Sequence, residues 1–167
     1  DGSWDIITSD SIEYLALPPG QVEWNISLQI LTGKSECVYG TSLFLGKQDI
    51  KLNQGYTFSG AFTGQWYCAD YKGLTGWAFT IQTSDLTNPD NNIIAGSNVL
   101  ISHAVPVVEG DDACTGYNGT STSFFGAPLP LMYKPEDLNN KNICKVSIDN
   151  VRLTINVPAN QAPGSYM

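Results

Sequence analysis

The stretch VRLTINV, from Val151 to Val157, decides the fold class of this chain. Every second residue in it is apolar, and polar residues lie between them. A period of two sends one set of side chains to a buried face and the other to solvent, as in a half-buried antiparallel β-strand. The stretch from Val22 to Ile30 alternates in the same way. The chain is therefore expected to be built from β-strands.

Weaker strand patterns extend outward from these two stretches. They cover residues 42–45, 56–61, 76–82, 98–108, the region of 124–125, and 131–133. Val146 and Ile148 alternate in the opposite phase to the opening stretch, so Asp149 and Asn150 mark a bulge or a tight bend. No window has a convincing helical period, although 135–138 is compatible with one short turn. The expected fold is all-β, a mostly antiparallel sandwich of the immunoglobulin-like or jelly-roll kind.

The cysteines indicate an oxidising compartment. There are four of them, Cys37, Cys68, Cys114 and Cys144, with no CxxC pair. Zinc sites cluster their ligands at characteristic spacings, so a metal site is not expected. An even number of cysteines at long spacing favours two disulfides. Three pairings are possible, and we prefer the sequential one, Cys37 with Cys68 and Cys114 with Cys144.

Size and charge narrow the possible functions. The chain has 167 residues, enough for one domain with a sizeable core, and a formal net charge of −8. Arg152 is the only arginine. Nucleic-acid binding and attraction to anionic membranes both need clustered Lys and Arg, so neither is expected. No apolar run approaches the length of about 20 residues that a membrane helix needs, so membrane insertion is not expected either.

The segment from Leu153 to Tyr166, LTINVPANQAPGSY, resembles the closing segment of receptor-binding domains in two-domain pilus tip adhesins. These are chaperone–usher fimbrial proteins of Gram-negative bacteria. The resemblance implies a receptor-binding domain over residues 1–157 and a linker over 158–167, leading to a pilin domain absent from this chain. Because the chain starts at Asp1 without methionine, we also expect a processed or trimmed start.

The resemblance further implies a function and a location. The domain would bind a host-cell receptor, a glycan or glycoprotein, through aromatic and Asp, Asn or Gln side chains on surface loops. It would act outside the cell, at the pilus tip, after periplasmic export. Its other partners would be the pilin domain, the periplasmic chaperone and the usher. No cofactor is implied.

Two stretches are candidates for the binding surface. The segment 66–77 carries Trp66, Tyr67, Asp70 and Tyr71, and sugars are bound by aromatic platforms beside short polar groups. Trp66 is as compatible with a core position as with a binding position, and Trp77 fits the core. The polar segment 109–119 carries Asp111, Asp112, Tyr117 and Asn118, and it is equally compatible with a connector anchored by Cys114. In a third segment, 84–92, oxygen donors suit Ca²⁺, but turn chemistry explains them better.

Catalysis is not expected. His103 is the only histidine, and its place in an apolar alternation suggests a hydrogen-bonded core residue. There is no GxSxG motif, and no pair of acidic residues stands out for glycoside hydrolysis. Two alternatives remain open: a structural, pilin-like surface module, and a small secreted carbohydrate-active hydrolase. The first predicts an exposed sheet edge, and the second predicts two acidic residues facing each other in a cleft.

Overall fold

The computed structural model describes most of the chain after residue 34. The described residues are 11–17, 20–30, 35–40, 42–43, 45, 53–71, 73, 76–110, 114–137, 142–162 and 166; for 11–30 and 35 the description covers the backbone only. This part of the chain consists of strands, loops and one short 3-10 turn, η1 (Gly96–Asn98), with no α-helix. All its strand pairs are antiparallel, so the all-β class is confirmed.

The first sheet contains the second long alternating stretch of the sequence. Its order is β1-β2-β7-β14-β12. The bounds are β1 Ser11–Leu17, β2 Gly20–Ile30, β7 Trp77–Gln82, β14 Leu129–Lys134 and β12 Thr115–Gly116. Strand β2 lies beside β7 over six register pairs, from Asn25 opposite Gln82 to Ile30 opposite Trp77. The expected strands at 22–30, 76–82 and 131–133 are thus confirmed.

Two further sheets carry most of the remaining strands. One has the order β13-β10-β16-β5-β4 and the other β11-β15-β6-β3. In the first of these the bounds are β13 Thr122–Ser123, β10 Val99–Ser102, β16 Arg152–Val157, β5 Tyr56–Thr63 and β4 Ser42–Leu43. In the second they are β11 Val107–Gly110, β15 Cys144–Ile148, β6 Trp66–Asp70 and β3 Ser35–Val38. A small hairpin of β8 (Leu86–Thr87) and β9 (Ile93–Ile94) lies apart from them.

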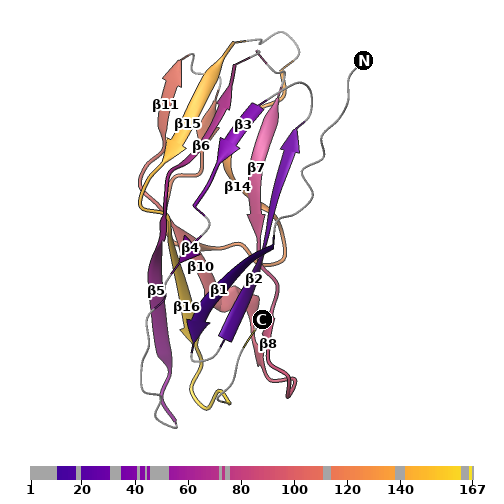
Figure 1. Cartoon of the computed structure of the whole chain (residues 1–167), viewed down its shortest axis with the longest axis vertical. Helices are drawn as coiled ribbons and strands as arrows, with labels where there is room; N and C mark the ends of the chain where they lie inside the picture. Colours follow the sequence, from indigo (N-terminus) through magenta and orange to yellow (C-terminus); the bar gives the residue numbers. More distant parts are fainter. Residues whose placement is uncertain are drawn as a thin grey trace.

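Three strands of one sheet continue directly into three strands of the other. Strand β5 leads into β6, β10 leads into β11, and β15 leads into β16. The order β10-β16-β5 therefore matches the order β11-β15-β6. In Figure 1 the β11-β15-β6-β3 sheet occupies the upper half of the molecule, and β10, β16 and β5 occupy the lower half. We call the row of three connections the bend line.

Local backbone chemistry places a break in each of the three strands. Gly64 has a φ of 98° and Asn150 a φ of 54°, both in the left-handed region that strands do not use. The third connection contains Pro106, which has no N–H to donate to a ladder. The expected bend at Asp149–Asn150 is confirmed. The strand expected over 98–108 is corrected: it is two strands, β10 and β11, in different sheets, because the segment around Pro106 interrupts it.

Hydrogen bonds hold the three connections beside one another. The backbone N–H of Phe62 donates to the carbonyl of Val151 at 2.8 Å, and that of Ala104 donates to the carbonyl of Asp149 at 2.8 Å. The connection between β15 and β16 lies between the other two, and these bonds join it to β5 on one side and to the β10–β11 connection on the other. Because satisfied backbone groups resist opening, the bend line is a fixed structural feature.

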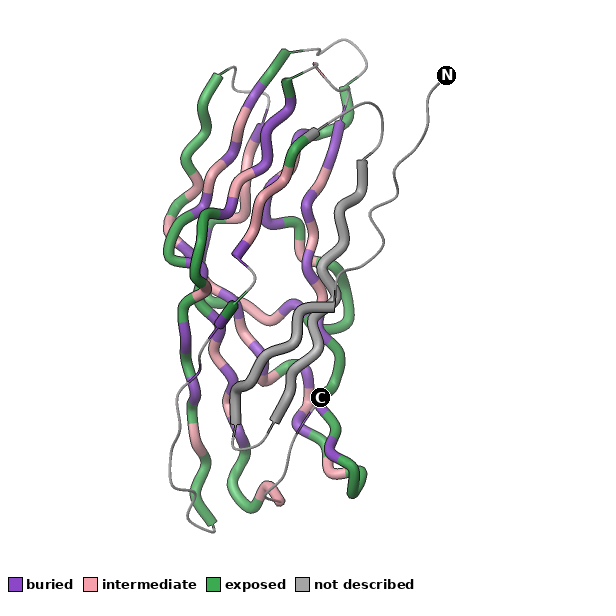
Figure 2. The backbone as a smooth tube through the Cα atoms, in the orientation of Figure 1, coloured by how far each residue is buried: buried purple, intermediate pink, exposed green. Residues whose placement is uncertain are grey.

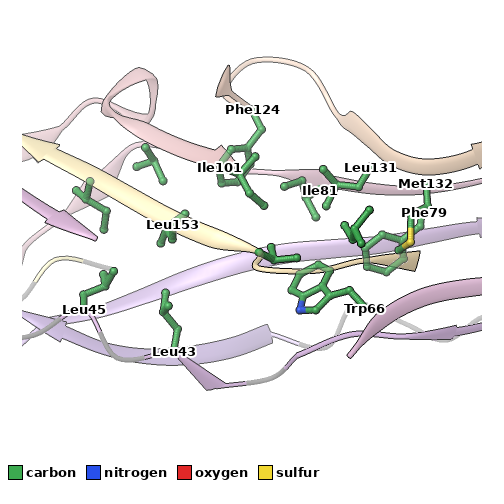
Figure 3. Packing of buried hydrophobic residues seen from close by; sticks show 14 of the residues in the cluster. Leu43, Leu45, Trp66, Phe79, Ile81, Ile101, Phe124, Leu131, Met132 and Leu153 are labelled. Carbon is green, nitrogen blue, oxygen red and sulfur yellow. The ribbon is translucent and has the colours of Figure 1, made fainter. Parts of the chain in front are cut away.

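One hydrophobic cluster joins all three sheets. It draws on the apolar phase of strands such as β6, β7, β15 and β16, and Figure 2 shows the resulting alternation of buried and more exposed residues along the tube. The side chains labelled in Figure 3 are Leu43, Leu45, Trp66, Phe79, Ile81, Ile101, Phe124, Leu131, Met132 and Leu153. Sheets that bury such a common core are consistent with the expected sandwich.

Tyr166 belongs to this core even though it lies within the segment expected to be a linker. Its side chain is 2% exposed, and its hydroxyl donates to the carbonyl of Ala162 at 2.6 Å. The amide of Gln161 donates to the same hydroxyl at 2.6 Å. At this residue the segment 158–167 is therefore held against the domain.

Both disulfides follow the preferred sequential pairing. Cys37 and Cys68 face each other across β3 and β6, with Cα atoms 4.1 Å apart. Cys114 precedes β12 and Cys144 begins β15, so this bridge joins the first sheet to the third, with Cα atoms 5.9 Å apart. The short helical turn expected over 135–138 does not form at residues 135–137, and residue 138 lies outside the described residues.

Candidate functional site

Trp66 is a core residue and not a surface platform. The sequence interpretation placed it in a loop, but it lies on strand β6 and is 3% exposed. Its ring meets those of Phe62 and Tyr39 at centroid distances of 5.1 and 6.0 Å. It meets that of Phe79 at 5.9 Å, and Figure 3 shows these two rings. The pleat of β6 turns the indole inward, into the core position that the sequence left open, and Trp66 also contributes to the lining of the groove described below.

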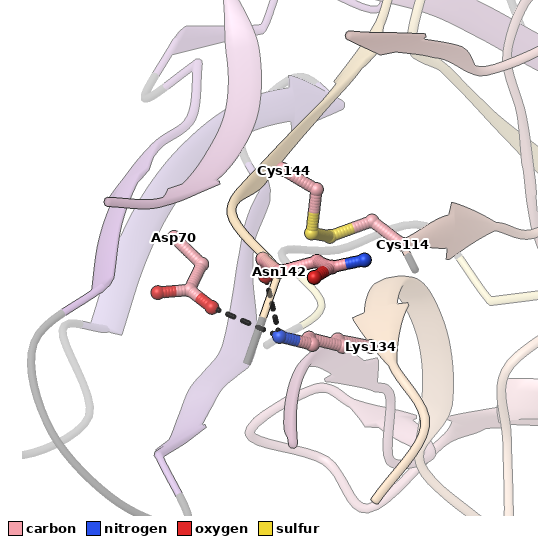
Figure 4. A network of polar contacts seen from close by, with 5 residues as sticks. All are labelled: Asp70, Cys114, Lys134, Asn142 and Cys144. Atoms are coloured by element: carbon pink, nitrogen blue, oxygen red, sulfur yellow. Dashed lines mark hydrogen bonds and ion pairs between the residues drawn. A yellow bond between two sulfur atoms is a disulfide. The ribbon is translucent and has the colours of Figure 1, made fainter. Parts of the chain in front are cut away.

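Asp70 is also buried, at 0% exposed, and it has a structural partner. The ammonium of Lys134, at the end of β14, lies 3.3 Å from the Asp70 carboxylate and donates to the carbonyl of Asn142 at 2.7 Å (Figure 4). Since β6 and β14 belong to different sheets, the ion pair connects the two sheets. Asp70 is thereby removed from the predicted ligand-binding surface.

Tyr67 has the opposite orientation and stands on the outer face of the sheet. It is half-buried, and its register partner on β15 is Ser147, which in turn pairs with Val107 on β11. One row farther along, Lys145 of β15 pairs with Glu109 of β11. Residues in the same phase of adjacent strands share a face, so these side chains gather around the Tyr67 ring.

A groove of about 270 Å³ lies on this outer face. It is lined by Gln65, Trp66, Tyr67, Val107, Glu109, Lys145, Ser147 and Asp149. Two of these, Gln65 and Asp149, belong to the connections that form the bend line. The groove therefore begins where the strands break and extends over β6, β15 and β11.

Polar contacts position the groove side chains. The Lys145 ammonium lies 3.1 Å from the Glu109 carboxylate and 5.4 Å from the centroid of the Tyr67 ring. The Tyr67 hydroxyl donates to the Glu36 carboxylate at 3.3 Å. Partial burial, followed by the charge of Glu36, raises the pKa of Tyr67 above 10.0, so its hydroxyl stays protonated at neutral pH. The groove thus combines an aromatic ring with hydroxyl, amide, ammonium and carboxylate groups.

The other predicted binding residues lie outside the groove. Tyr71 is 62% exposed and follows β6. Tyr117 is half-buried against the core, and its hydroxyl is 2.9 Å from that of Thr120. The Asn118 side chain accepts hydrogen bonds from Thr120 at 3.2 and 2.9 Å, which closes a local turn. Asp111 and Asp112 lie outside the described residues.

The segment 84–92 forms a turn, as preferred from its sequence. Asn88 is buried, and its side-chain oxygen accepts from the backbone of Asp90 at 3.1 Å and of Asn92 at 2.7 Å. Asp85 accepts from the backbone N–H of Gly96 at 2.8 Å. Asn88 thus caps the connection between β8 and β9, and Asp85 joins the segments that precede β8 and follow β9. Within the described residues, no group of three or more His, Cys, Asp or Glu side chains is arranged to hold a metal ion.

His103 is buried at the bend line, as its alternation predicted. Its Nδ1 lies 2.6 Å from the carbonyl of Ala104 and therefore donates to it, while Nε2 has no hydrogen-bond partner among the described residues. The ring stacks edge-on against Tyr117 at a centroid distance of 5.9 Å. Burial lowers the pKa of His103 below 6.5 and outweighs the opposing effect of the hydrogen bond.

Sequence reasoning missed most of the groove residues. It selected Trp66 and Tyr67 but placed β6 in a loop, and it did not select Gln65, Val107, Lys145, Ser147 or Asp149. Glu109 begins one of the candidate stretches, but it was not chosen. One signal was present: the polar phase of CKVSI, residues 144–148, contains Lys145 and Ser147. What was absent is any sign that this strand lies between β6 and β11.

Comparison of the chain with protein-family models, with curated proteins and with solved structures finds no match. Among the described residues, no helix is long and apolar enough to cross a membrane.

Proposed function

We propose that this chain is the receptor-binding domain of a fimbrial tip adhesin and that it holds a host glycan in the groove. The observation that carries the proposal is the Tyr67 ring, surrounded by short polar side chains on the outer face of β11, β15 and β6. The closing segment from Leu153 to Tyr166 supports the adhesin part. Under this proposal the pilin domain, chaperone and usher are partners, and the two disulfides support export to an oxidising compartment.

The chemistry of the groove suits a sugar. A pyranose presents an apolar C–H face, which packs on an aromatic ring, and hydroxyls that need acceptors and donors around that ring. Gln65 and Ser147 supply neutral groups, and Asp149 supplies a carboxylate acceptor. A groove of about 270 Å³ lies just below the usual range of ligand-site volumes, which suits a small ligand such as a terminal sugar. Weak single-site binding is adequate where many pili act together.

The framework around the groove is rigid, which limits the entropic cost of binding. Tyr67 is adjacent to Cys68, and Lys145 is adjacent to Cys144, so a disulfide anchors the backbone next to each of these two groove residues. The hydrogen-bonded bend line holds Asp149 in place. A site that is ordered before the ligand arrives does not lose affinity to ordering.

The arrangement favours recognition over hydrolysis, although two acidic residues line the groove. The Glu109 side chain is 59% exposed and lies against the Lys145 ammonium. The acid of a glycosidase works from a desolvated position, opposite a second carboxylate at a set separation. The environment of Glu109 therefore differs from that of a general acid.

A glycan-array screen tests the proposal, with Tyr67→Ala as the key variant and Tyr71→Ala as its matched control. Tyr71 is a second tyrosine close by, exposed and directly after β6, but it does not line the groove. We expect Tyr67→Ala to abolish measurable binding and Tyr71→Ala to leave it unchanged, with both variants melting close to the parent. Absence of binding by a well-folded domain to any glycan would refute the proposal. Turnover of a bound glycan, lost in Glu109→Gln or Asp149→Asn, would support the hydrolase alternative.

The exposed edge of β11 favours a second candidate, a protein receptor. Within the described residues β11 has a neighbour on one side only, and Val107 and the preceding Val105 are 55% and 76% exposed. An extended peptide can add a strand to such an edge. Binding to host extracellular proteins that slows amide exchange at Val107–Gly110 would support this candidate. Val108→Lys should then weaken protein binding without affecting glycan binding.

A further inference from the structure

Negatively charged groups outnumber positively charged ones on and beside the groove. Glu109 and Asp149 line it as carboxylates, and among the described residues that line it Lys145 is the only cation. A third carboxylate, Glu36, binds the Tyr67 hydroxyl. With Lys145 counted against the three carboxylates, the groove and its rim carry a net negative charge. The whole chain adds to this field with a net charge of −8.

The one cation of the groove is already engaged. Lys145 lies 3.1 Å from Glu109 and above the Tyr67 ring. The other cations of the described residues are committed elsewhere: Lys134 is buried with Asp70, and Arg152 of β16 donates to Ser59 at 3.3 Å. Sites for anionic ligands rely on arginine forks or on a free ammonium. An anionic sugar in this groove would have to separate Lys145 from Glu109.

From this charge arrangement we infer that the groove selects neutral glycans and rejects glycans that carry a carboxylate or a sulfate. The inference rests on the proposed glycan-binding function of the groove. A neutral sugar hydroxyl donates well to Glu109 or Asp149, since hydrogen bonds to a charged acceptor are the stronger kind. A negative charge placed a few ångströms from the same carboxylates is repelled instead.

The test separates the charge of the ligand from its size. Neutral oligosaccharides that end in galactose are each compared with their sialic-acid-capped form and with the methyl ester of that form. We expect the neutral and ester forms to bind within about threefold of each other and the free acid about tenfold more weakly at low salt, the effect of one close like-charge pair at a surface. Raising NaCl beyond 0.1 M should narrow the difference, because the Debye length falls below about 10 Å.

A variant pair checks that the groove carboxylates cause the rejection. Glu109→Gln combined with Asp149→Asn should remove the preference for the ester over the free acid. Asp90→Asn, in the turn between β8 and β9, removes an exposed carboxylate outside the groove and should leave the preference intact.

The possible outcomes are separable. If the acid form binds as well as the neutral form, or better, the inference is wrong while the glycan-binding function stands. If the ester is rejected as strongly as the acid, the cause is size and not charge, and the inference is again wrong. If no glycan binds at all, the proposed function fails first and the inference fails with it.

Discussion

The two faces of strand β6 have opposite roles, although their residues alternate along five positions. Trp66, Cys68 and Asp70 point inward, where they contribute an aromatic cluster, a disulfide and a buried ion pair. Tyr67 points outward and forms part of the groove. A stretch that looks like one aromatic and acidic binding motif in sequence is therefore divided by the pleat. Composition alone cannot assign such a motif to the surface.

The two ion pairs show the same difference between a buried and an exposed face. Lys134 and Asp70 are at most 1% exposed, whereas Lys145 and Glu109 are open to solvent. A buried charge that loses its partner remains desolvated, but an exposed one is rehydrated by water. The inner pair should therefore govern stability, and the outer pair should govern ligand preference.

Trp66 and Tyr67 provide the largest expected contrast. Trp66→Ala should lower the free energy of unfolding by about 3–5 kcal/mol, because it empties a space lined by three aromatic rings. Tyr67→Ala should cost less than about 1 kcal/mol, the size of a cross-strand contact on an outer face. Denaturant unfolding followed by fluorescence measures both. Equal losses for the two variants would mean that the assignment of the faces is wrong.

The two ion pairs give the next contrast. Lys134→Ala leaves Asp70 buried without its ammonium and should cost about 3–5 kcal/mol. Lys145→Ala removes an exposed partner and should cost at most about 1 kcal/mol. Thermal melting of the two variants compares them directly. A double variant, Lys134→Met with Asp70→Leu, should recover much of the loss, because no unpaired charge then remains.

Removal of the Cys37–Cys68 disulfide should lower the free energy of unfolding somewhat less, and it should also weaken glycan binding on the outer face of β6. Replacing Cys37 and Cys68 by alanine frees a 31-residue loop and should destabilise the domain by about 3 kcal/mol. Since Cys68 is adjacent to Tyr67, glycan affinity should also fall, even at temperatures where the variant is fully folded. Calorimetry and a binding titration on the same sample would separate the two effects. Unchanged affinity would show that the bridge does not order the groove.

His103 should produce the smallest effect, a dependence of stability on pH. Its pKa in the folded protein lies below the ordinary 6.5, so the unfolded chain takes up the proton first as the pH falls. The free energy of unfolding should therefore be constant above about pH 6.5 and decrease as the pH falls through the folded-state pKa. His103→Gln should lose this slope, because the chain has no other histidine. A rise in stability between pH 7 and 6 would contradict the assigned burial.

Much of the fold could be predicted from the sequence where apolar and polar residues alternate over a long stretch. The alternations at 22–30 and 151–157 became β2 and β16, and the even number of cysteines became two disulfides. Strand β6 was missed because Gly64 and Gly73 on either side suggested a loop and its apolar phase includes an aspartate. The Asp70 position is explained only by Lys134, 64 residues away, so no local pattern could reveal it.

For the candidate site, local sequence identified one ring and missed its surroundings. Tyr67 stood out as an aromatic residue beside a cysteine. Ser147 and Val107 became its neighbours only through the registers of β6 with β15 and of β15 with β11. These strands are separated by tens of residues, and strand order is a property of the folded sheet.

The sequence by itself determined the all-β class, the bend at Asp149–Asn150 and the presence of two disulfides. It could do so because side-chain alternation, the slip in its phase at Asp149–Asn150 and an even number of cysteines can be read from the sequence alone. The tertiary structure alone decided that the three bends fall in one row, where backbone hydrogen bonds join them. That row turned the outer face of β11, β15 and β6 into a groove, because only sheet pairing brings distant residues to the same face.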